Sequence, residues 1–190
     1  MELGNIGNYK AAEIIDRCLQ NDRFAQQYLY HYFSPKMFSI CLRYASDYHT
    51  AEDLLQEGFI KAFKYLHKFR REGSFEGWLR RIFVNTSIEA YRKNVRVYPI
   101  LDQENNEIDI VDQSCFFDLE HQDLLNMVQT LSPGYRTIFN LYAIEGYPHK
   151  EIAKMLDISE GTSKSQLARA RSILQRKVLA SQKLPAEIVS

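Results

Sequence analysis

Residues 131–178 read LSPGYRTIFNLYAIEGYPHKEIAKMLDISEGTSKSQLARARSILQRKV. This stretch predicts two helices followed by a helix-turn-helix. Apolar residues recur at helical spacing from Glu151 to Leu156, and the segment from Asp157 to Ser159 interrupts them. We expect Ser159 to cap the last helix, because its hydroxyl can accept a hydrogen bond from an exposed amide of the first turn. That helix is basic and has no acidic residue after Glu160.

The two faces of this last helix differ in kind. At about 100° per residue, one face is apolar or small and is expected to pack against the domain. The opposite face has small residues in the middle and long cations at the rim, so the helix axis could approach the floor of a DNA major groove. A solvated basic surface helix is the alternative, and the preceding turn favours DNA. The packing face is Ser163, Leu167, Ala170 and Leu174, and the opposite face is Gly161, Ser165, Ala168 and Ser172, flanked by Lys164, Arg169 and Arg176.

Composition limits the possible classes of protein. The chain has 190 residues and 45% hydrophobic content, enough for one domain or two small ones. It contains no run of 18 apolar residues, and Met1 to Lys10 lacks a charged-then-apolar leader, so we expect no membrane insertion and a cytoplasmic location. The cysteines Cys18, Cys41 and Cys115 are far apart and form no CxxC pair, which predicts buried free thiols.

The net charge of zero conceals a strong segregation of charge along the chain. Residues 101–123 contain eight acids and no Lys or Arg, whereas residues 161–178 contain five cations and no acid. The acidic stretch shows no helical period until about Phe116, so we interpret it as a linker between two helical domains. It could be a solubilising tether, or a polyanion that occupies a nucleic-acid path in a partner.

No catalytic constellation is visible in the sequence. The five histidines show no HExxH spacing, and neither a Gly-rich phosphate loop nor a GxSxG elbow occurs. A helical hydrolase using residues such as His49 with Asp53 is disfavoured, because the clustering that a metal or acid-base site needs is absent. We therefore expect no enzyme activity, no cofactor and no metal.

The N-terminal half is helical by periodicity and rich in aromatic residues. Asn21 or Asp22 is expected to start one helix, and Thr50 is expected to cap a second helix at residues 51–66. Ile60 stands alone on the polar, mostly acidic face of that second helix, either as an incidental apolar residue or as the anchor of a protein contact. The polar neighbours of Ile60 are Asp53, Gln56, Glu57 and Lys64. Earlier in the chain, the residues expected mostly in the core are Phe24, Tyr28, Leu29, Tyr32, Met37, Ile40, Cys41 and Tyr44.

A third helix is expected to begin after the loop at residues 69–74, with Ser74 as its cap, and to run to about Asn94. One stripe of this helix interleaves cations and an amide near aromatic surface, as a site for unstacked single-stranded bases requires. A cationic helix with Trp78 buried beneath it is the alternative. The stripe is Arg81, Asn85, Ile88 and Arg92, with Trp78 at its edge.

Three runs in this order carry a family resemblance: AEDLLQEGFIKAFKYL at residues 51–66, FRREGSFEGWLRRIFVNTSIEAYRK at 69–93, and the helix-turn-helix stretch. Together they resemble the extracytoplasmic-function subfamily of sigma-70 family RNA polymerase sigma factors. The resemblance covers about residues 20–97 and 120–178. It implies an all-α chain with a sigma-2-like domain at 1–97, the acidic linker at 98–119, and a sigma-4-like domain with a C-terminal tail at 120–190.

The resemblance also implies partners and roles. The sigma-2-like domain would bind the clamp of core RNA polymerase and open the −10 element, and the sigma-4-like domain would read the −35 element of promoter DNA while contacting the polymerase flap. An anti-sigma factor would regulate both in response to an envelope or environmental signal. The implied polymerase-binding residues are Asp53, Gln56, Glu57 and Ile60; the −10 residues are Phe69, Ser74, Trp78, Arg81, Asn85 and Arg92; the −35 residues are Thr162, Lys164, Ser165, Ala168, Arg169 and Arg171.

Three residues depart from the family pattern. Pro148 replaces the usual Ser or Thr cap of the first helix of the helix-turn-helix, and suits a first helical turn. Asp157 replaces the Gly of the turn and tolerates left-handed φ. Ser163 replaces an aliphatic residue, which predicts thinner packing under the last helix. An alternative function is a two-domain helix-turn-helix regulator that acts without polymerase, but it offers no reason for Ile60 on its polar face.

Overall fold

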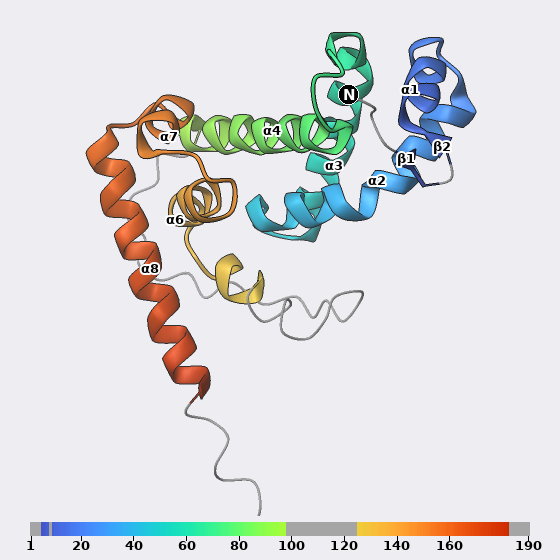
Figure 1. Cartoon of the computed structure of the whole chain (residues 1–190). Coiled ribbons are helices and arrows are strands. Elements are labelled where there is room, and N and C mark those ends of the chain that lie inside the picture. Colours follow the sequence, from blue (N-terminus) through green and yellow to red (C-terminus); the bar gives the residue numbers. More distant parts are fainter. Residues whose placement is uncertain (1–4, 8, 98–124, 183–190) are drawn as a thin grey trace, which may run out of the picture. The chain divides into compact units, whose positions relative to one another are not determined.

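The computed structural model describes residues 5–7, 9–97 and 125–182. Nearly all of them are helical, which confirms the predicted all-α class apart from a small antiparallel hairpin of β1 (Asn5–Ile6) and β2 (Tyr9–Lys10) (Figure 1). The chain divides into two compact units, residues 1–90 and 91–190. The predicted acidic linker, together with Cys115, lies outside the described residues.

The first unit contains α1 (Ala11–Leu19), α2 (Arg23–Tyr44), α3 (Tyr48–Tyr65), the short 3-10 helix η1 (Leu66–Lys68) and most of α4 (Phe75–Val97). The predicted start of α2 is confirmed, because Asp22 Oδ1 accepts a hydrogen bond from the Phe24 amide at 2.9 Å. The hydrogen bond from Arg17 lowers the pKa of the Asp22 carboxyl, which keeps the cap ionised.

Helix α2 continues through Pro35; it buries one side in its first half and a wider arc at residues 40–42. Leu29, Met37, Ile40, Cys41 and Tyr44 are buried as expected. The prediction was wrong for Phe24 and Tyr32, whose side chains are 52% and 39% exposed. Their rings stack on either side of the Tyr28 ring along α2. The centroid distances are 6.4 Å for Phe24–Tyr28 and 6.5 Å for Tyr28–Tyr32. Helical spacing brought these rings together, but solvent rather than core covers much of their surface.

The expected cap of α3 was misplaced by three residues. The helix begins at Tyr48, and Asp47 is its cap, with Oδ1 accepting from the Thr50 amide at 2.8 Å. Thr50 lies inside the first turn, where its hydroxyl donates to Asp47 Oδ2 at 2.9 Å. The hydrogen bond from the Thr50 amide lowers the pKa of the Asp47 carboxyl.

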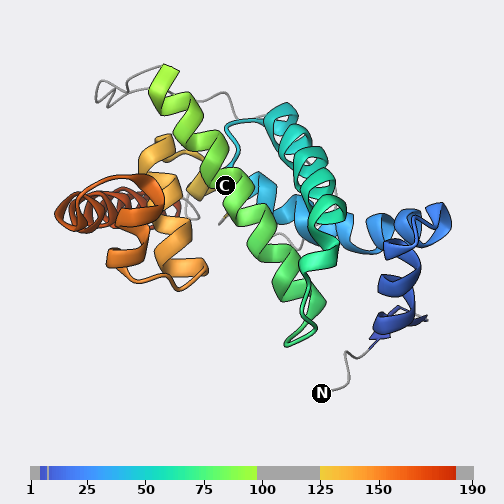
Figure 2. The same cartoon turned by 90° about the horizontal axis from the view of Figure 1, so that it is seen from above.

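Two contacts hold α3 against α4. Figure 2 shows the two helices and the loop that joins them. The rings of Phe59 and Phe83 meet edge to face, with centroids 5.2 Å apart. A Cβ atom at Gly58 would overlap the Phe83 ring, so glycine permits this close approach. At the surface, Lys61 Nζ lies 2.8 Å from Glu57 and 2.7 Å from Glu89, and so joins the two helices.

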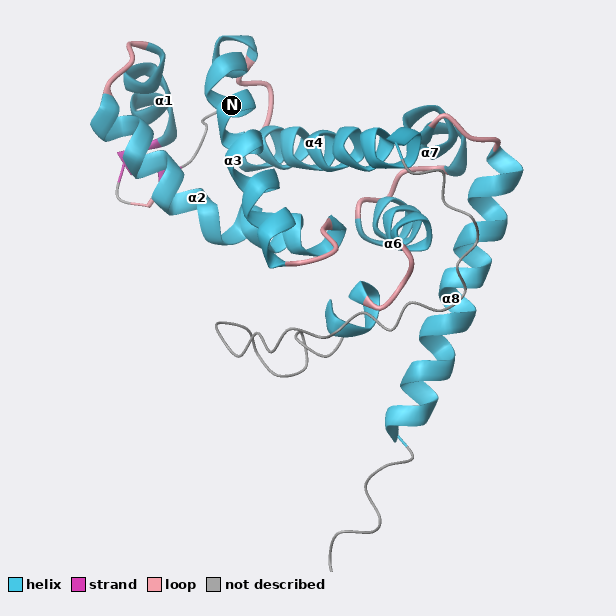
Figure 3. Ribbon diagram, turned by 180° about the vertical axis from the view of Figure 1, so that it is seen from behind, coloured by secondary structure: helices cyan, strands magenta, loops and turns pink. Residues whose placement is uncertain are grey.

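Besides the end of α4, the second unit contains a helical turn at residues 125–129, α6 (Pro133–Phe139), the π-helical turn η2 (Asn140–Ile144), α7 (His149–Leu156) and α8 (Glu160–Gln182) (Figure 3). Val128, Leu131, Ala170 and Leu174 form a buried cluster beneath α8. Arg136 is 1% exposed and donates from Nη1 to the Gln129 carbonyl at 3.1 Å. These contacts hold α6 and the start of the unit against the long C-terminal helix.

Candidate nucleic-acid interface

The turn between α7 and α8 has the predicted geometry. Asp157 ends α7 at φ 59° and ψ 48°, the left-handed conformation that its short polar side chain tolerates. Ser159 caps α8, because its Oγ accepts from the Thr162 amide at 2.9 Å. Pro148 lies one position before α7, as an N-cap without a side-chain hydrogen bond, and the first helical residue is His149. The helix therefore starts without the hydroxyl cap that is common in the family.

Both predicted faces of α8 are confirmed. Its packing face is buried, with Ser163, Leu167, Ala170 and Leu174 at 8% exposure or less. The four small residues of the opposite face are exposed along the length of the helix, as are the flanking cations. This leaves a shallow, neutral strip, flanked by positive charge, on the outside of the unit. The exposed small residues are Gly161, Ser165, Ala168 and Ser172, and the exposed cations are Lys164, Arg169, Arg171 and Arg176.

Each of the first three cations of α8 has a specific neighbour. Lys164 lies 2.7 Å from Glu160, and its hydrogen bond lowers the pKa of that carboxyl. Arg169 donates from Nη1 to the Tyr135 hydroxyl at 3.1 Å. The guanidinium carbon of Arg171 lies 5.4 Å from the ring centroid of Tyr142. Of the other residues assigned to −35 DNA, Thr162 is half-buried in the first turn and Ser165 donates to its carbonyl at 3.0 Å.

The predicted thinner packing at Ser163 describes only part of what this residue does. The side chain is fully buried, and its Oγ lies 2.9 Å from His149 Nδ1. A hydrogen bond between α7 and α8 thus replaces the apolar contact that an aliphatic residue would make. His149, Tyr142 and Tyr135 were not singled out by the sequence, because their partners lie 7 to 34 residues away along the chain.

The loop before α4 is anchored in its middle and at its end. Arg71 forms an ion pair with Asp16 of α1, and Ser74 Oγ accepts from the Gly77 amide at 3.0 Å, which confirms the predicted cap. Phe69, Phe75 and Trp78 contact one another with ring centroids 5.3–5.4 Å apart. Phe69 and Trp78 are half-buried in this group, so each ring is only partly available for stacking.

The stripe predicted on α4 is interrupted. Arg81 and Asn85 are exposed and Arg92 is half-buried, but Ile88 is only 4% exposed and does not belong to the surface. Val84, Ser87 and Ile88 are all buried in the middle of this helix. Their spacing shows that the buried residues occupy a wider arc than one amphipathic stripe, which is why the periodicity misassigned Ile88.

A third surface lies on α3. Ile60 is 67% exposed, the largest exposed fraction among the described large hydrophobic side chains. Asp53, Gln56 and Glu57 are exposed beside it, and Glu57 is paired with Lys61 at 2.8 Å. This apolar side chain, surrounded by polar and acidic groups, has the composition of a protein-contact anchor.

Comparison with protein families accounts for both units. Residues 29–97 match the family model of sigma-70 region 2, and residues 121–174 match that of sigma-70 region 4. The chain belongs to the extracytoplasmic-function subfamily of the sigma-70 family. It is an alternative sigma factor, a transcription initiation factor that acts with core RNA polymerase on promoter DNA.

Curated relatives and a solved structure agree with this assignment. The sigma factor is 28% identical to the sigma-E factor of Haemophilus influenzae, over 87% of this chain and 93% of the relative. It is 30% identical to the factor SigE of Mycolicibacterium smegmatis, over 74% of this chain and 56% of the relative. It resembles the sigma factor RpoE of Bartonella quintana, solved with the anti-sigma factor NepR, with a TM-score of 0.51, 25% identity and coverage of 86% of this chain and 98% of the other.

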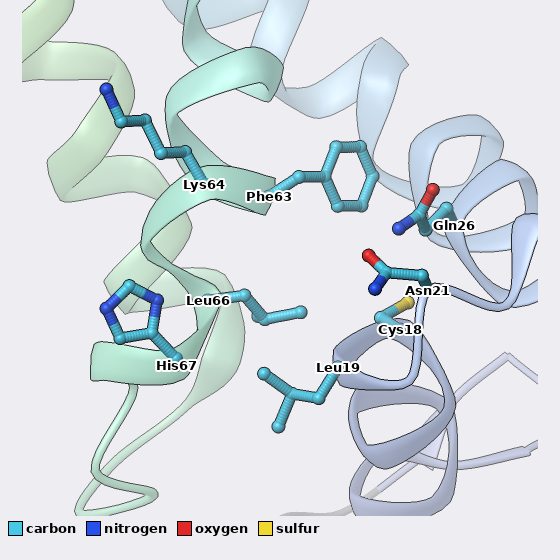
Figure 4. A pocket seen from close by; sticks show the side chains of 8 residues that line it. All are labelled: Cys18, Leu19, Asn21, Gln26, Phe63, Lys64, Leu66 and His67. Carbon is cyan, nitrogen blue, oxygen red and sulfur yellow. The ribbon is translucent and has the colours of Figure 1, made fainter.

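The first unit of this sigma factor has a pocket lined by apolar, amide and basic side chains. It lies between the α1–α2 turn and the end of α3, with a volume of about 400 Å³ (Figure 4). Phe63 and Leu66 point into it, and burial raises the pKa of the Cys18 thiol at its base to about 11. Cys41, the other described cysteine, is also a buried free thiol, as predicted.

The described part of the chain shows neither a metal-binding cluster nor a membrane-spanning helix. No three His, Cys, Asp or Glu side chains in residues 5–7, 9–97 and 125–182 are grouped so that they could hold a metal ion. In the same residues, no helix combines the length and apolar character needed to cross a membrane.

Proposed function

We propose that this sigma factor reads the −35 element with α8, captures unstacked −10 bases with α4 and the loop before it, and binds the polymerase clamp through the Ile60 surface. The exposed face of α8 carries the proposal. Its small residues leave room for the floor of a major groove, and Lys164, Arg169 and Arg171 lie where they can reach phosphates or guanine edges. The domain limits proposed for these roles are residues 1–97 and 120–190, joined by a linker at 98–119.

The −10 assignment rests on the loop and the exposed part of α4. Arg71 anchors the middle of the loop and Ser74 its end, and Arg81 and Asn85 are exposed beyond it on α4. An amide and a guanidinium can hydrogen-bond an unstacked base and its backbone. Half-buried Phe69 and Trp78 supply an aromatic edge rather than a free stacking platform. Arg92 extends the same side of the helix and is half-buried.

The proposals for regulation and location rest on the family of this chain. The relative from Bartonella quintana was solved with an anti-sigma factor. We propose that a separate anti-sigma protein covers the polymerase and DNA surfaces of this chain until an envelope or environmental signal releases it. The factor would act in the cytoplasm, where promoter DNA and polymerase are found, and would contribute binding rather than catalysis of its own.

The decisive experiment separates polymerase binding from DNA binding. Holoenzyme is assembled from this sigma factor and core RNA polymerase, and run-off transcription is measured on promoters selected by that holoenzyme. Ile60→Glu should weaken the free energy of binding to core polymerase by on the order of 2 kcal/mol or more, because the contact would bury a carboxylate. Phe24→Glu, the same change at another exposed apolar side chain, is the matched control and should assemble normally. A folded Ile60→Glu variant that binds core polymerase like wild type would overturn the clamp assignment.

A further inference from the structure

Tyr142 lies at the centre of a stacked group in the second unit. Its ring is nearly parallel to that of His149, with centroids 4.5 Å apart and an interplanar angle of 24°. The Arg171 guanidinium also lies against the Tyr142 ring, at 5.4 Å from its centroid. The group therefore joins η2, the first residue of α7 and the middle of α8.

A buried hydrogen bond fixes the His149 end of this group. His149 Nδ1 lies 2.9 Å from Ser163 Oγ, and Ser163 is fully buried on the packing face of α8. A ring held by a buried partner has little freedom to rotate. The face that His149 presents to Tyr142 is thus set by α8 itself, the same helix that carries Arg171.

We propose that Tyr142 and His149 are positioning residues for Arg171 in −35 recognition, an inference that rests on the proposed DNA contact of α8. A cation–π contact attracts the guanidinium to the ring without an oxygen acceptor, so its N–H groups can still hydrogen-bond to a ligand. Those N–H groups are the ones that bind a guanine edge or a phosphate. Tyr142 thus restricts the long Arg171 side chain without using the hydrogen bonds that DNA requires.

Arg169 provides an internal contrast. One of its N–H groups donates to the Tyr135 hydroxyl, so this tyrosine holds the arginine by an edge. An edge used in that way is not available to DNA in the same geometry. The two tyrosines should therefore affect binding differently, with Tyr142 assisting Arg171 and Tyr135 competing with DNA for Arg169.

A double-mutant cycle tests the positioning role. Holoenzymes carrying Tyr142→Ala, Arg171→Ala or both are titrated against the selected −35 duplex. Tyr142→Ala should weaken binding by about two- to five-fold, the range of an exposed cation–π contact. In the Arg171→Ala background the same change should have no effect. Tyr142→Phe keeps the ring and should bind like wild type, and Tyr142→Leu replaces Tyr142→Ala if the latter does not fold.

His149 and Ser163 extend the cycle. His149→Ala should weaken binding less than Tyr142→Ala, and its effect should also vanish without Arg171. Ser163→Ala should behave like His149→Ala once thermal unfolding has shown that the unit is intact. These dependences on Arg171 would not arise from a purely structural role, because a general loss of order would weaken both backgrounds equally.

The outcomes distinguish this inference from the proposed function. Equal weakening by Tyr142→Ala in both backgrounds, or Tyr142→Phe as weak as Tyr142→Ala, would overturn the positioning role. So would an Arg171→Ala variant that binds like wild type. In each of those cases the Ala168→Glu variant would still fail to bind the −35 duplex if α8 occupies the groove. If the Ala168→Glu variant instead binds like wild type, the −35 assignment itself is wrong.

Discussion

The helices α4 and α8 are built alike and are packed differently. Each has 23 residues, and each begins after a serine whose hydroxyl accepts from the amide three positions on, at 3.0 Å for Ser74 and 2.9 Å for Ser159. In α8 every residue predicted to face solvent does so, whereas in α4 Ile88 is buried. Helical periodicity locates an interface correctly where only one side of a helix is packed, and fails where the buried arc is wider.

The two helices also present their cations differently. In α8 the cations lie on both sides of a strip of small residues, and Arg169 and Arg171 each contact a tyrosine from earlier in the unit. In α4 the exposed Arg81 and Asn85 lie beyond a loop that an ion pair and a cap hold in place. The first arrangement suits a duplex groove, and the second suits a base taken out of a duplex.

The largest expected effect concerns the residue at which the two helices differ. Ile88→Ala removes a buried side chain and should lower the free energy of unfolding by about 2–5 kcal/mol. Ala168→Ser, a small change on the exposed face of α8, should alter it by no more than about 0.5 kcal/mol. Urea denaturation of both variants measures the contrast. An Ile88→Ala variant as stable as wild type would place Ile88 back on the surface stripe.

Next in size is the loss of −35 recognition. Ala168→Glu adds bulk and a negative charge to the strip of α8 that should face the groove, and should reduce affinity by about 100-fold or more. Ala180→Glu makes the same substitution at an exposed alanine twelve positions further along the helix, about 120° around it from Ala168, and is the matched control that should bind like wild type. Both are compared by titrating holoenzyme against a −35 duplex library at two salt concentrations. Wild-type affinity for Ala168→Glu would place α8 outside the groove.

A more selective effect is expected on α4. Asn85→Ala should impair promoter melting while changing stability by no more than about 0.5 kcal/mol, because Asn85 is exposed. A promoter already mismatched across the −10 bases should be less affected, since its bases are unpaired at the start. Permanganate footprinting on duplex and mismatched promoters reports the melting. Identical footprints for mutant and wild type on the duplex would remove Asn85 from base capture.

The smallest effect concerns the caps. Ser74→Ala, Ser159→Ala and Asp47→Ala should each lower the free energy of unfolding by about 1 kcal/mol. Only the loss caused by Asp47→Ala should depend on pH, because serine does not titrate. The pKa of Asp47 is lowered in the folded state, so its contribution is fully present above the usual carboxyl pKa of about 3.9 and is lost as the pH falls through the lowered value.

Thermal unfolding between pH 7 and pH 3 measures this difference. The gap between wild type and Asp47→Ala should be constant down to about pH 5 and should shrink below about pH 4. The gaps for the two serine variants should stay level over the same range. A gap for Asp47→Ala that does not change with pH would mean that the carboxylate charge contributes nothing to the cap.

Local features of this sigma factor could be predicted from the sequence alone. The caps at Asp22, Ser74 and Ser159, the left-handed Asp157 and both faces of α8 follow from residue chemistry within one or two turns of helix. The exposed Ile60 on α3 was also predicted. Such signals need no knowledge of what the helix packs against, since the interacting groups are close in the chain.

Other features were decided only by the tertiary structure. The Asp47 cap of α3 is not among them: its hydrogen bond from the Thr50 amide spans only three residues, and it was missed because the apolar pattern suggested a later start for the helix. Phe24 is exposed and Ile88 is buried because each depends on which elements surround its helix, and a helical period cannot report that. The group formed by Ser163, His149, Tyr142 and Arg171 joins residues separated by 7 to 29 positions, so only the packed helix-turn-helix brings it together.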